Sequence, residues 1–287
     1  MNWIITSFLM FFSSIVYYLI TKKALINKIE SRVYMLANFS IPAVLYFLLH
    51  VFQKRSIFVE WKMLFIIVVN AFIFSYIGSI ISYKALEKAP NAGYSLTIQK
   101  SYAVYTSIAA IFVFGSSLTL FKFLAILLII VSTAFILIEK KRPSSKPNYQ
   151  WVIYSFAAFF IFGTLRLNNK LIINAGVPAV TMLFWTMVFV ALFSFFDLLK
   201  SRNQIKTKLN SENIFVLFGI GTTVSLFYYF LQMSEVIAPN IGFVSAINTA
   251  SNAFYTVLVA FIFKDHLSLK KLLAVLGVTI GLIFLVL

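Results

Sequence analysis

The sequence predicts an all-α membrane protein with ten transmembrane helices, arranged as two inverted five-helix repeats. Composition, the spacing of apolar segments and an internal repeat lead to this fold class. Of the 287 residues, 61% are hydrophobic and 11% are charged, whereas soluble domains carry about 25% charged residues. The net charge of +16 would suggest nucleic acid in a soluble protein, but here the basic residues gather in short gaps between apolar segments. Such residues favour a lipid bilayer as the partner, and we expect no nucleic-acid binding.

Ten apolar segments follow one another along the chain. A helical span needs about 20 mostly apolar residues, and gaps with charge, proline or asparagine separate segments of this length. The predicted spans are 3–20, 33–52, 61–83, 91–114, 119–138, 151–171, 178–199, 212–234, 240–263 and 268–287. The gaps between them are too short to hold a soluble domain.

The two halves of the chain repeat one another. Residues 89–138 align with residues 238–287 without a gap, and 14 of the 50 positions are identical. We therefore predict a first repeat over 1–138, a linker over 139–150 and a second repeat over 151–287. Since each repeat has an odd number of spans, the two halves enter the membrane in opposite directions, as in many secondary transporters.

An Ala-Pro-Asn-x-Gly motif begins at Ala89 and again at Ala238. Proline is tolerated at a helix start and asparagine is a favourable N-cap. The motif therefore predicts where the fourth and ninth spans begin, and we assign it no chemistry.

The ten-span repeat, together with this motif, resembles the EamA-type members of the drug/metabolite transporter superfamily over the whole chain. The family often has Gly-Glu-x-Leu-Thr after the fourth and ninth spans. Here the first copy reads GSSLT from Gly115 and the second reads KDHLS from Lys264, so the acid is absent in one and replaced by Asp265 in the other. The resemblance implies a secondary transporter of the cell membrane. Such a protein moves a small polar metabolite (an amino acid, sugar or other organic ion) by alternating access through a cavity lined by the first four spans of each half.

Residue types that carry catalysis are sparse. There are two histidines and no cysteine, the acids lie at span ends or in loops, and no Gly-x-x-x-x-Gly-Lys-Ser/Thr is present. We therefore predict no enzyme, no metal, no cofactor and no carboxylate relay at mid-membrane. The alternative is a non-transporting membrane protein or enzyme on the same scaffold.

Polar residues inside the spans are the candidate substrate-binding residues. The ninth span carries Ser245, Asn248, Thr249 and Asn252 at helical spacing on one face, which suits a cavity wall or interhelical packing. Gln99 and Lys100 occupy the aligned place in the fourth span. Arg166 in the sixth span is either a cavity charge or a snorkelling residue.

Lys100 is the most informative of these residues. It lies nine residues past Asn91, about 13 Å along the helix and near the middle of a hydrocarbon core about 30 Å thick. Facing lipid there costs at least about 2.5–3.5 kcal/mol. Lys100 therefore either binds an anionic group of the substrate or hydrogen-bonds backbone carbonyls at a bent helix.

Two further patterns leave alternatives open. The Gly-x-x-x-Gly pattern from Gly277 to Gly281 suits packing against the ninth span or a homodimer through the last helix. Orientation is also ambiguous. The connections after the odd-numbered spans hold 17 Lys and Arg, against six for the even-numbered connections and the termini. This places both termini outside by the positive-inside rule, whereas the family resemblance implies cytoplasmic termini. We take the charge count as the prediction.

Overall fold

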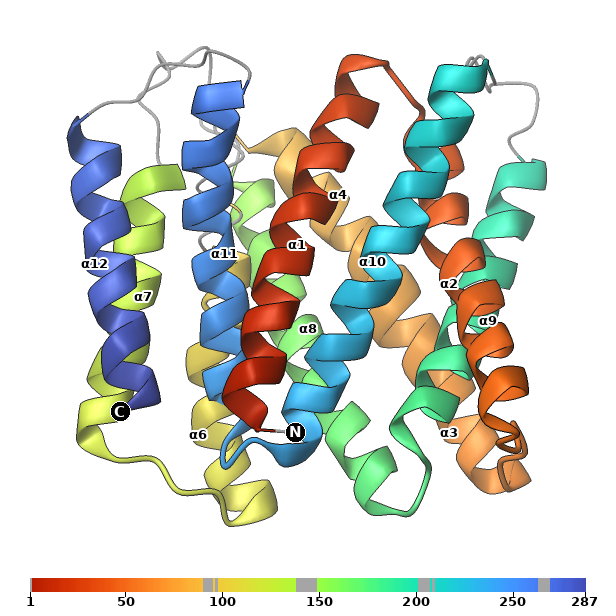
Figure 1. The fold of residues 1–287 in the computed structure, drawn as a ribbon, viewed down its shortest axis with the longest axis horizontal. Coiled ribbons are helices and arrows are strands. Elements are labelled where there is room, and N and C mark those ends of the chain that lie inside the picture. The colour runs from red at the N-terminus through yellow and green to blue at the C-terminus, as the bar shows by residue number, and fades with distance from the viewer. Residues whose placement is uncertain are drawn as a thin grey trace.

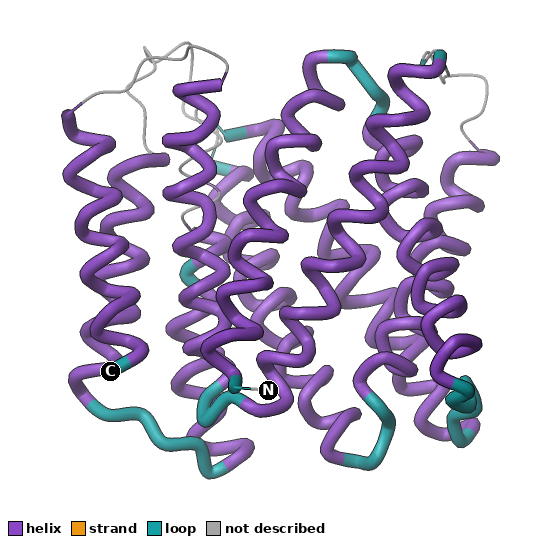
Figure 2. The backbone as a smooth tube through the Cα atoms, in the orientation of Figure 1, coloured by secondary structure: helices purple, strands orange, loops and turns teal. Residues whose placement is uncertain are grey.

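The computed structural model describes residues 2–89, 95, 98–137, 149–200, 207, 210–262 and 269–287. Within these ranges all regular structure is helical, and the described connections between helices are short loops (Figure 2). The helices form one bundle whose members run mainly between two opposite ends of the molecule (Figure 1). The prediction of an all-α protein is therefore confirmed for the described residues.

The first half of the chain contributes α1 (Trp3–Ile26), α2 (Ser31–Gln53), α3 (Trp61–Asn70), the π-helical turn η1 (Ala71–Ile77), α4 (Gly78–Lys88), α6 (Tyr102–Phe114) and α7 (Leu120–Leu137). The second half contributes α8 (Gln150–Asn174), α9 (Ala179–Lys200), α10 (Ser211–Ile237), α11 (Ile241–Ile262) and α12 (Leu269–Val286). Where the structure describes them, the predicted spans fall on helical residues, whereas most of the first residues of the fourth predicted span lie outside the described residues.

Among the described residues, six helices are long and apolar enough to cross a membrane, namely Trp3–Ala24, Ser31–Gln53, Trp61–Lys88, Gln150–Asn174, Ala179–Lys200 and Ser211–Ile237. Three shorter apolar helices are Ile98–Phe114, Leu120–Phe135 and Leu272–Val286. Large apolar side chains such as Phe52, Phe112 and Phe215 are exposed on the outside of the bundle, which suits a lipid environment rather than water. The chain is a multi-pass membrane protein. The count of ten spans and the inversion of the halves remain predictions.

Helices from the two halves pack against each other throughout the bundle. α1 packs on α10, and α4 packs on α8. In addition, α2 packs on α9, α6 on α11 and α7 on α12. The interior between them is partly polar, since serine, threonine, asparagine and glutamine side chains are buried among the apolar ones.

The second Ala-Pro-Asn motif begins a helix as predicted. The Asn240 side chain accepts a hydrogen bond from the Gly242 backbone N–H at 2.8 Å, and α11 starts at Ile241. The Asn240 amide also donates to the Ser107 carbonyl of α6 at 3.1 Å. A Cβ on Gly242 would lie 2.6 Å from the Ser107 Cα, so this glycine lets α11 approach α6 closely. Apart from Ala89, the first copy of the motif lies outside the described residues.

The glycines of α12 face α7, which corrects both readings of the Gly-x-x-x-Gly pattern. A Cβ on Gly277 would lie 2.4 Å from Ser132 Oγ, and one on Gly281 would lie 2.7 Å from Ile129 Cγ1. The face therefore packs against the fifth predicted span rather than the ninth. Because α7 already occupies it, this face is not open to a second copy of the chain, and a homodimer through it is not supported.

Candidate functional site

The helix that carries Lys100 is interrupted just after it. Residues Ile98–Lys100 are helical, a turn follows at Ser101 (φ −63°, ψ −6°), and α6 begins at Tyr102. The interruption sets Lys100 and Tyr102 at the junction of two helical segments, where they reach different neighbours.

Lys100 contacts α1 and α11. Its ammonium donates to the Tyr18 hydroxyl at 3.3 Å and lies 5.8 Å from the centroid of that ring. Its backbone carbonyl accepts a hydrogen bond from Thr249 Oγ1 at 3.3 Å. The helix is interrupted here, but among the described residues the ammonium binds a phenol and no backbone carbonyl. Lys100 therefore makes a cation–π and phenol contact, which the sequence did not predict.

Arg166 extends from α8 toward the same region. Its side chain is 11% exposed, and it lies near Tyr102 and Lys100, with which it interacts electrostatically. Arg166 Nε lies 3.8 Å from Glu235 Oε1 of α10. Arg166 is thus an interior charge and not a snorkelling residue.

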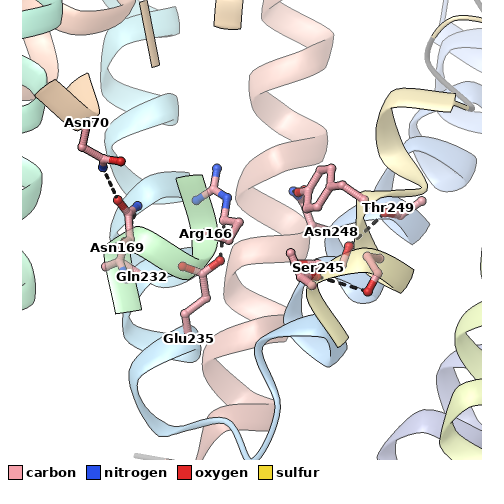
Figure 3. A network of polar contacts seen from close by, with 11 residues as sticks. Asn70, Arg166, Asn169, Gln232, Glu235, Ser245, Asn248 and Thr249 are labelled. Carbon is pink, nitrogen blue, oxygen red and sulfur yellow. Dashed lines mark hydrogen bonds and ion pairs between the residues drawn. The ribbon is translucent and has the colours of Figure 1, made fainter. Parts of the chain in front are cut away.

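The polar face of α11 contacts Lys100 and Tyr102, and Figure 3 shows Ser245, Asn248 and Thr249 on this face. Ser245, Asn248, Thr249 and Asn252 are all buried, as expected from their spacing. Asn248 Nδ2 donates to the Tyr102 hydroxyl at 3.4 Å, so the tyrosine that lies near Arg166 is also bonded to α11. Within the described residues no hydrogen bond reaches Ser245 Oγ or Asn248 Oδ1. Both atoms are therefore available for a further hydrogen bond.

Gln99 does not join this group. Its side-chain oxygen accepts from Ser82 Oγ at 2.6 Å and its amide donates to Ser95 Oγ at 2.9 Å. Ser95 in turn hydrogen-bonds Ser155 of α8. Gln99 points toward α4 and α8 because consecutive helical residues face directions about 100° apart, so it cannot share the environment of Lys100.

Glu235 is the residue that sequence reasoning missed. The sequence places it among the acids at span ends, yet its side chain is fully buried, with no exposed surface. Lys170 lies nearby and donates its ammonium to the carbonyls of Glu235 and Val236 at the end of α10. A usable signal was the brevity of the segment between α10 and α11, since so short a connection leaves no loop to carry the acid into water.

A ladder of carboxamides links three helices next to this pair (Figure 3). Asn70 of α3 donates to Asn169 Oδ1 at 2.9 Å, and Asn169 donates to Gln232 Oε1 at 3.2 Å. The ladder fixes Gln232 one turn before Glu235 and thereby holds α10 against α8.

Metal ligands are not clustered in the described part of the chain, where no group of three or more His, Asp or Glu side chains comes together. A pocket lined by Ile57, Trp61, Leu64 and Trp185 lies between the α2–α3 connection and α9. Its lining is mostly apolar and it includes none of the predicted site residues, so we place the candidate site at Lys100, Arg166 and the α11 face instead.

Comparison with known proteins supports the family resemblance drawn from the sequence. Residues 149–287 match the model of the EamA-like transporter family. This half of the chain belongs to the EamA-like transporter family. Members of the family are membrane transporters of the drug/metabolite type rather than enzymes, and the match confirms the resemblance drawn from the sequence.

Solved structures share the fold of this chain over nearly its whole length. Twenty-nine chains match. One of them, described only as "Crystal structure of protein", has a TM-score of 0.79 at 12% identity and covers 98% of each chain. At this identity the match shows a common fold alone. A comparison with curated proteins gives no match.

Proposed function

We propose that this protein is a secondary transporter of the cell membrane that moves a small polar metabolite with an anionic group by alternating access. We further propose that Lys100 and Arg166 attract the anionic group, and that Ser245, Asn248, Thr249 and Asn252 of α11 contribute polar contacts. Gln99 supports the site from the α4 side without facing it.

The observation that carries the proposal is the pairing of two interior cations. Lys100 and Arg166 interact with each other and share a setting of Tyr18, Tyr102 and Asn248. Like charges held together in a low-dielectric interior repel, and an anion between them relieves that repulsion. Their arrangement therefore favours a substrate carboxylate or phosphate over a neutral solute.

The packing of the bundle supports alternating access between two related halves. If α1 corresponds to α8, and α3–α4 to α10, exchanging the halves turns the α1–α10 contact into the α8–α4 contact. The α2–α9, α6–α11 and α7–α12 contacts map onto themselves. Lys100 and Thr249, which are aligned in the repeat, also bond to each other. This is the pattern expected of two halves related by a pseudo-two-fold axis, as in inverted-repeat transporters.

Reconstitution of the purified protein into liposomes tests the function. The panel pairs charged and uncharged solutes of similar size, namely glutamate with glutamine, glucose 6-phosphate with glucose, and AMP with adenosine. We expect saturable counterflow with at least one anionic member and none, or much less, with its uncharged partner. Equal counterflow of both members would contradict the anionic preference, and absence of counterflow across the panel would contradict carriage of these metabolite classes.

A further inference from the structure

We propose that Glu235 is the proton-binding residue of this transporter, and that protonation of Glu235 releases Arg166 to hold the substrate anion. Proton and anion then cross the membrane in the same direction. This inference rests on the proposed function and deepens it by naming the coupling ion and the residue that carries it.

The first step is the unusual setting of the Glu235 carboxylate. It is fully buried, and no hydrogen bond from the described residues reaches either Oε1 or Oε2. The neighbouring Lys170 ammonium is engaged by backbone carbonyls. A buried carboxylate without hydrogen-bond donors is costly, because nothing replaces the water it has lost.

The second step is the weakness of its ion pair. Arg166 Nε is 3.8 Å from Glu235 Oε1, too far for a hydrogen bond, and Arg166 Nε itself lacks a hydrogen-bond partner among the described residues. A buried pair offsets its desolvation only when the geometry is good and the remaining polar atoms are satisfied. At the other end of α10, the exposed Glu212 lies 2.9 Å from Lys23. The same helix therefore carries one carboxylate well suited to stay ionised and one poised to take a proton.

The third step is the position of Arg166 between two anion sites. Arg166 faces Glu235 (Figure 3), and it also interacts electrostatically with Tyr102 and Lys100 of the proposed substrate site. An ionised Glu235 competes with a substrate anion for the same guanidinium. When Glu235 takes a proton, the guanidinium is free for the anion, so binding of each favours binding of the other by reciprocal linkage.

Other titratable groups around the pair are less suited to this role. α10 packs against α1, α2, α8, α9 and α11. Arg166 and Lys170 of α8 interact with Glu235. Tyr18 of α1, Tyr102 of α6 and Tyr228 of α10 lie near Arg166.

The titratable groups on α2 and α9 have partners of their own. His50 hydrogen-bonds Thr181, and Arg32 forms an ion pair with Asp197. Phenols stay neutral near pH 7. Glu235 and Lys100 therefore remain as candidates for the group that binds the coupling proton, and the experiments below distinguish them.

The transport test uses proteoliposomes loaded at one pH and diluted into another, with labelled glutamate, glucose 6-phosphate or AMP as the probe. For one proton carried with each monovalent anion, a gradient of one pH unit drives accumulation of up to about tenfold. We expect Glu235→Gln to retain counterflow and lose this accumulation, because the amide resembles the protonated acid. Glu212→Gln is the matched control on the same helix and keeps both activities. Lys100→Arg retains the pH response if Glu235 is the coupling group.

A second measurement reads protonation without any substrate. Infrared difference spectra of the purified protein during a pH titration report the C=O stretch of a buried, protonated carboxyl. We expect this band in the parent and in Glu212→Gln but not in Glu235→Gln, and at a shifted midpoint in Glu235→Asp, which also serves if the glutamine variant folds poorly.

The outcomes separate the two proposals. Counterflow that continues without any response to the pH gradient, or accumulation that survives in Glu235→Gln, overturns the coupling role and leaves the transporter proposal standing. Absence of counterflow in the parent overturns the proposed function, and the infrared band then decides the protonation of Glu235. If the parent protein lacks this band, Glu235 does not take a proton, and the proposed coupling role is overturned.

Discussion

Lys100 lies at a helix interruption, and its ammonium is held by the Tyr18 hydroxyl and ring rather than by a carboxylate. A phenol stabilises an interior cation only partly, since it supplies a dipole and a π face but no full charge. The residual field of the ammonium therefore remains available to a substrate anion. Arg166 differs, because its field is shared between Glu235 and the site. In the proposed mechanism the two cations therefore have separate tasks: Lys100 attracts the substrate anion, and protonation of Glu235 releases Arg166.

Replacing Lys100 tests the first of these tasks. We expect Lys100→Met to raise the KM for the transported anion by about 10–100-fold, the usual effect of losing a charged hydrogen bond. Lys100→Arg should retain part of the affinity. Uptake kinetics of the anionic probe in proteoliposomes measure both, and Lys84→Met, an exposed lysine of α4, is the control. A Met variant that transports like the parent would show that Lys100 is not the binding cation.

At the scale of elements, the crossing of α6 and α11 positions the site. Lys100 and Tyr102 lie around the start of α6. They are hydrogen-bonded to Thr249 and Asn248 of α11, respectively. The crossing is close because Gly242 has no side chain and because the Asn240 amide bonds the Ser107 carbonyl. The spacing of these two helices therefore sets the geometry of the polar groups between them.

Gly242→Ala tests this spacing. The added Cβ would lie 1.7 Å from Ser107 Oγ and 2.6 Å from the Ser107 Cα, so the helices must separate. Overpacking of this kind costs about 1–3 kcal/mol, and we expect a lower thermal midpoint together with weaker transport. Ser107→Ala should not restore stability, because the contact with Cα remains. As a control, Gly219→Ala of α10 meets only Ile20 at 3.5 Å and should change stability little. Equal midpoints for both variants, measured by thermal unfolding in detergent, would show that α6 and α11 are not held this closely.

At the scale of the whole molecule, the distribution of charge bears on orientation. Both termini lie at the end of the bundle where α2 ends and α3 begins (Figure 1), and α1 ends at the opposite end. Of the six basic residues counted on the side of the termini, Arg166 and Lys170 have contacts inside the bundle. They are therefore weaker determinants of topology than loop residues, which strengthens the inequality that underlies the positive-inside prediction.

Cysteine labelling measures the orientation directly, since the natural sequence contains no cysteine. We expect Ser144→Cys, in the linker outside the described residues, to be protected from an impermeant maleimide in intact cells and labelled after permeabilisation. Ser56→Cys, exposed in the α2–α3 connection, should be labelled in intact cells. The reverse pattern would place both termini in the cytoplasm, as the family resemblance implies.

The sequence by itself determined the helical class, the membrane environment and the start of α11. Each depends on information local to a segment, such as the apolarity of about 20 residues or the capping chemistry of Asn240. It also indicated the buried face from Ser245 to Asn252, because helical spacing alone puts these residues on one side. The tertiary structure decided which groups meet. It paired Arg166 with Glu235, gave Lys100 to Tyr18, turned Gln99 toward α4, and set the glycines of α12 against α7. These contacts join residues far apart in the chain, and they depend on how helices rotate and cross, which no pattern within a single helix specifies.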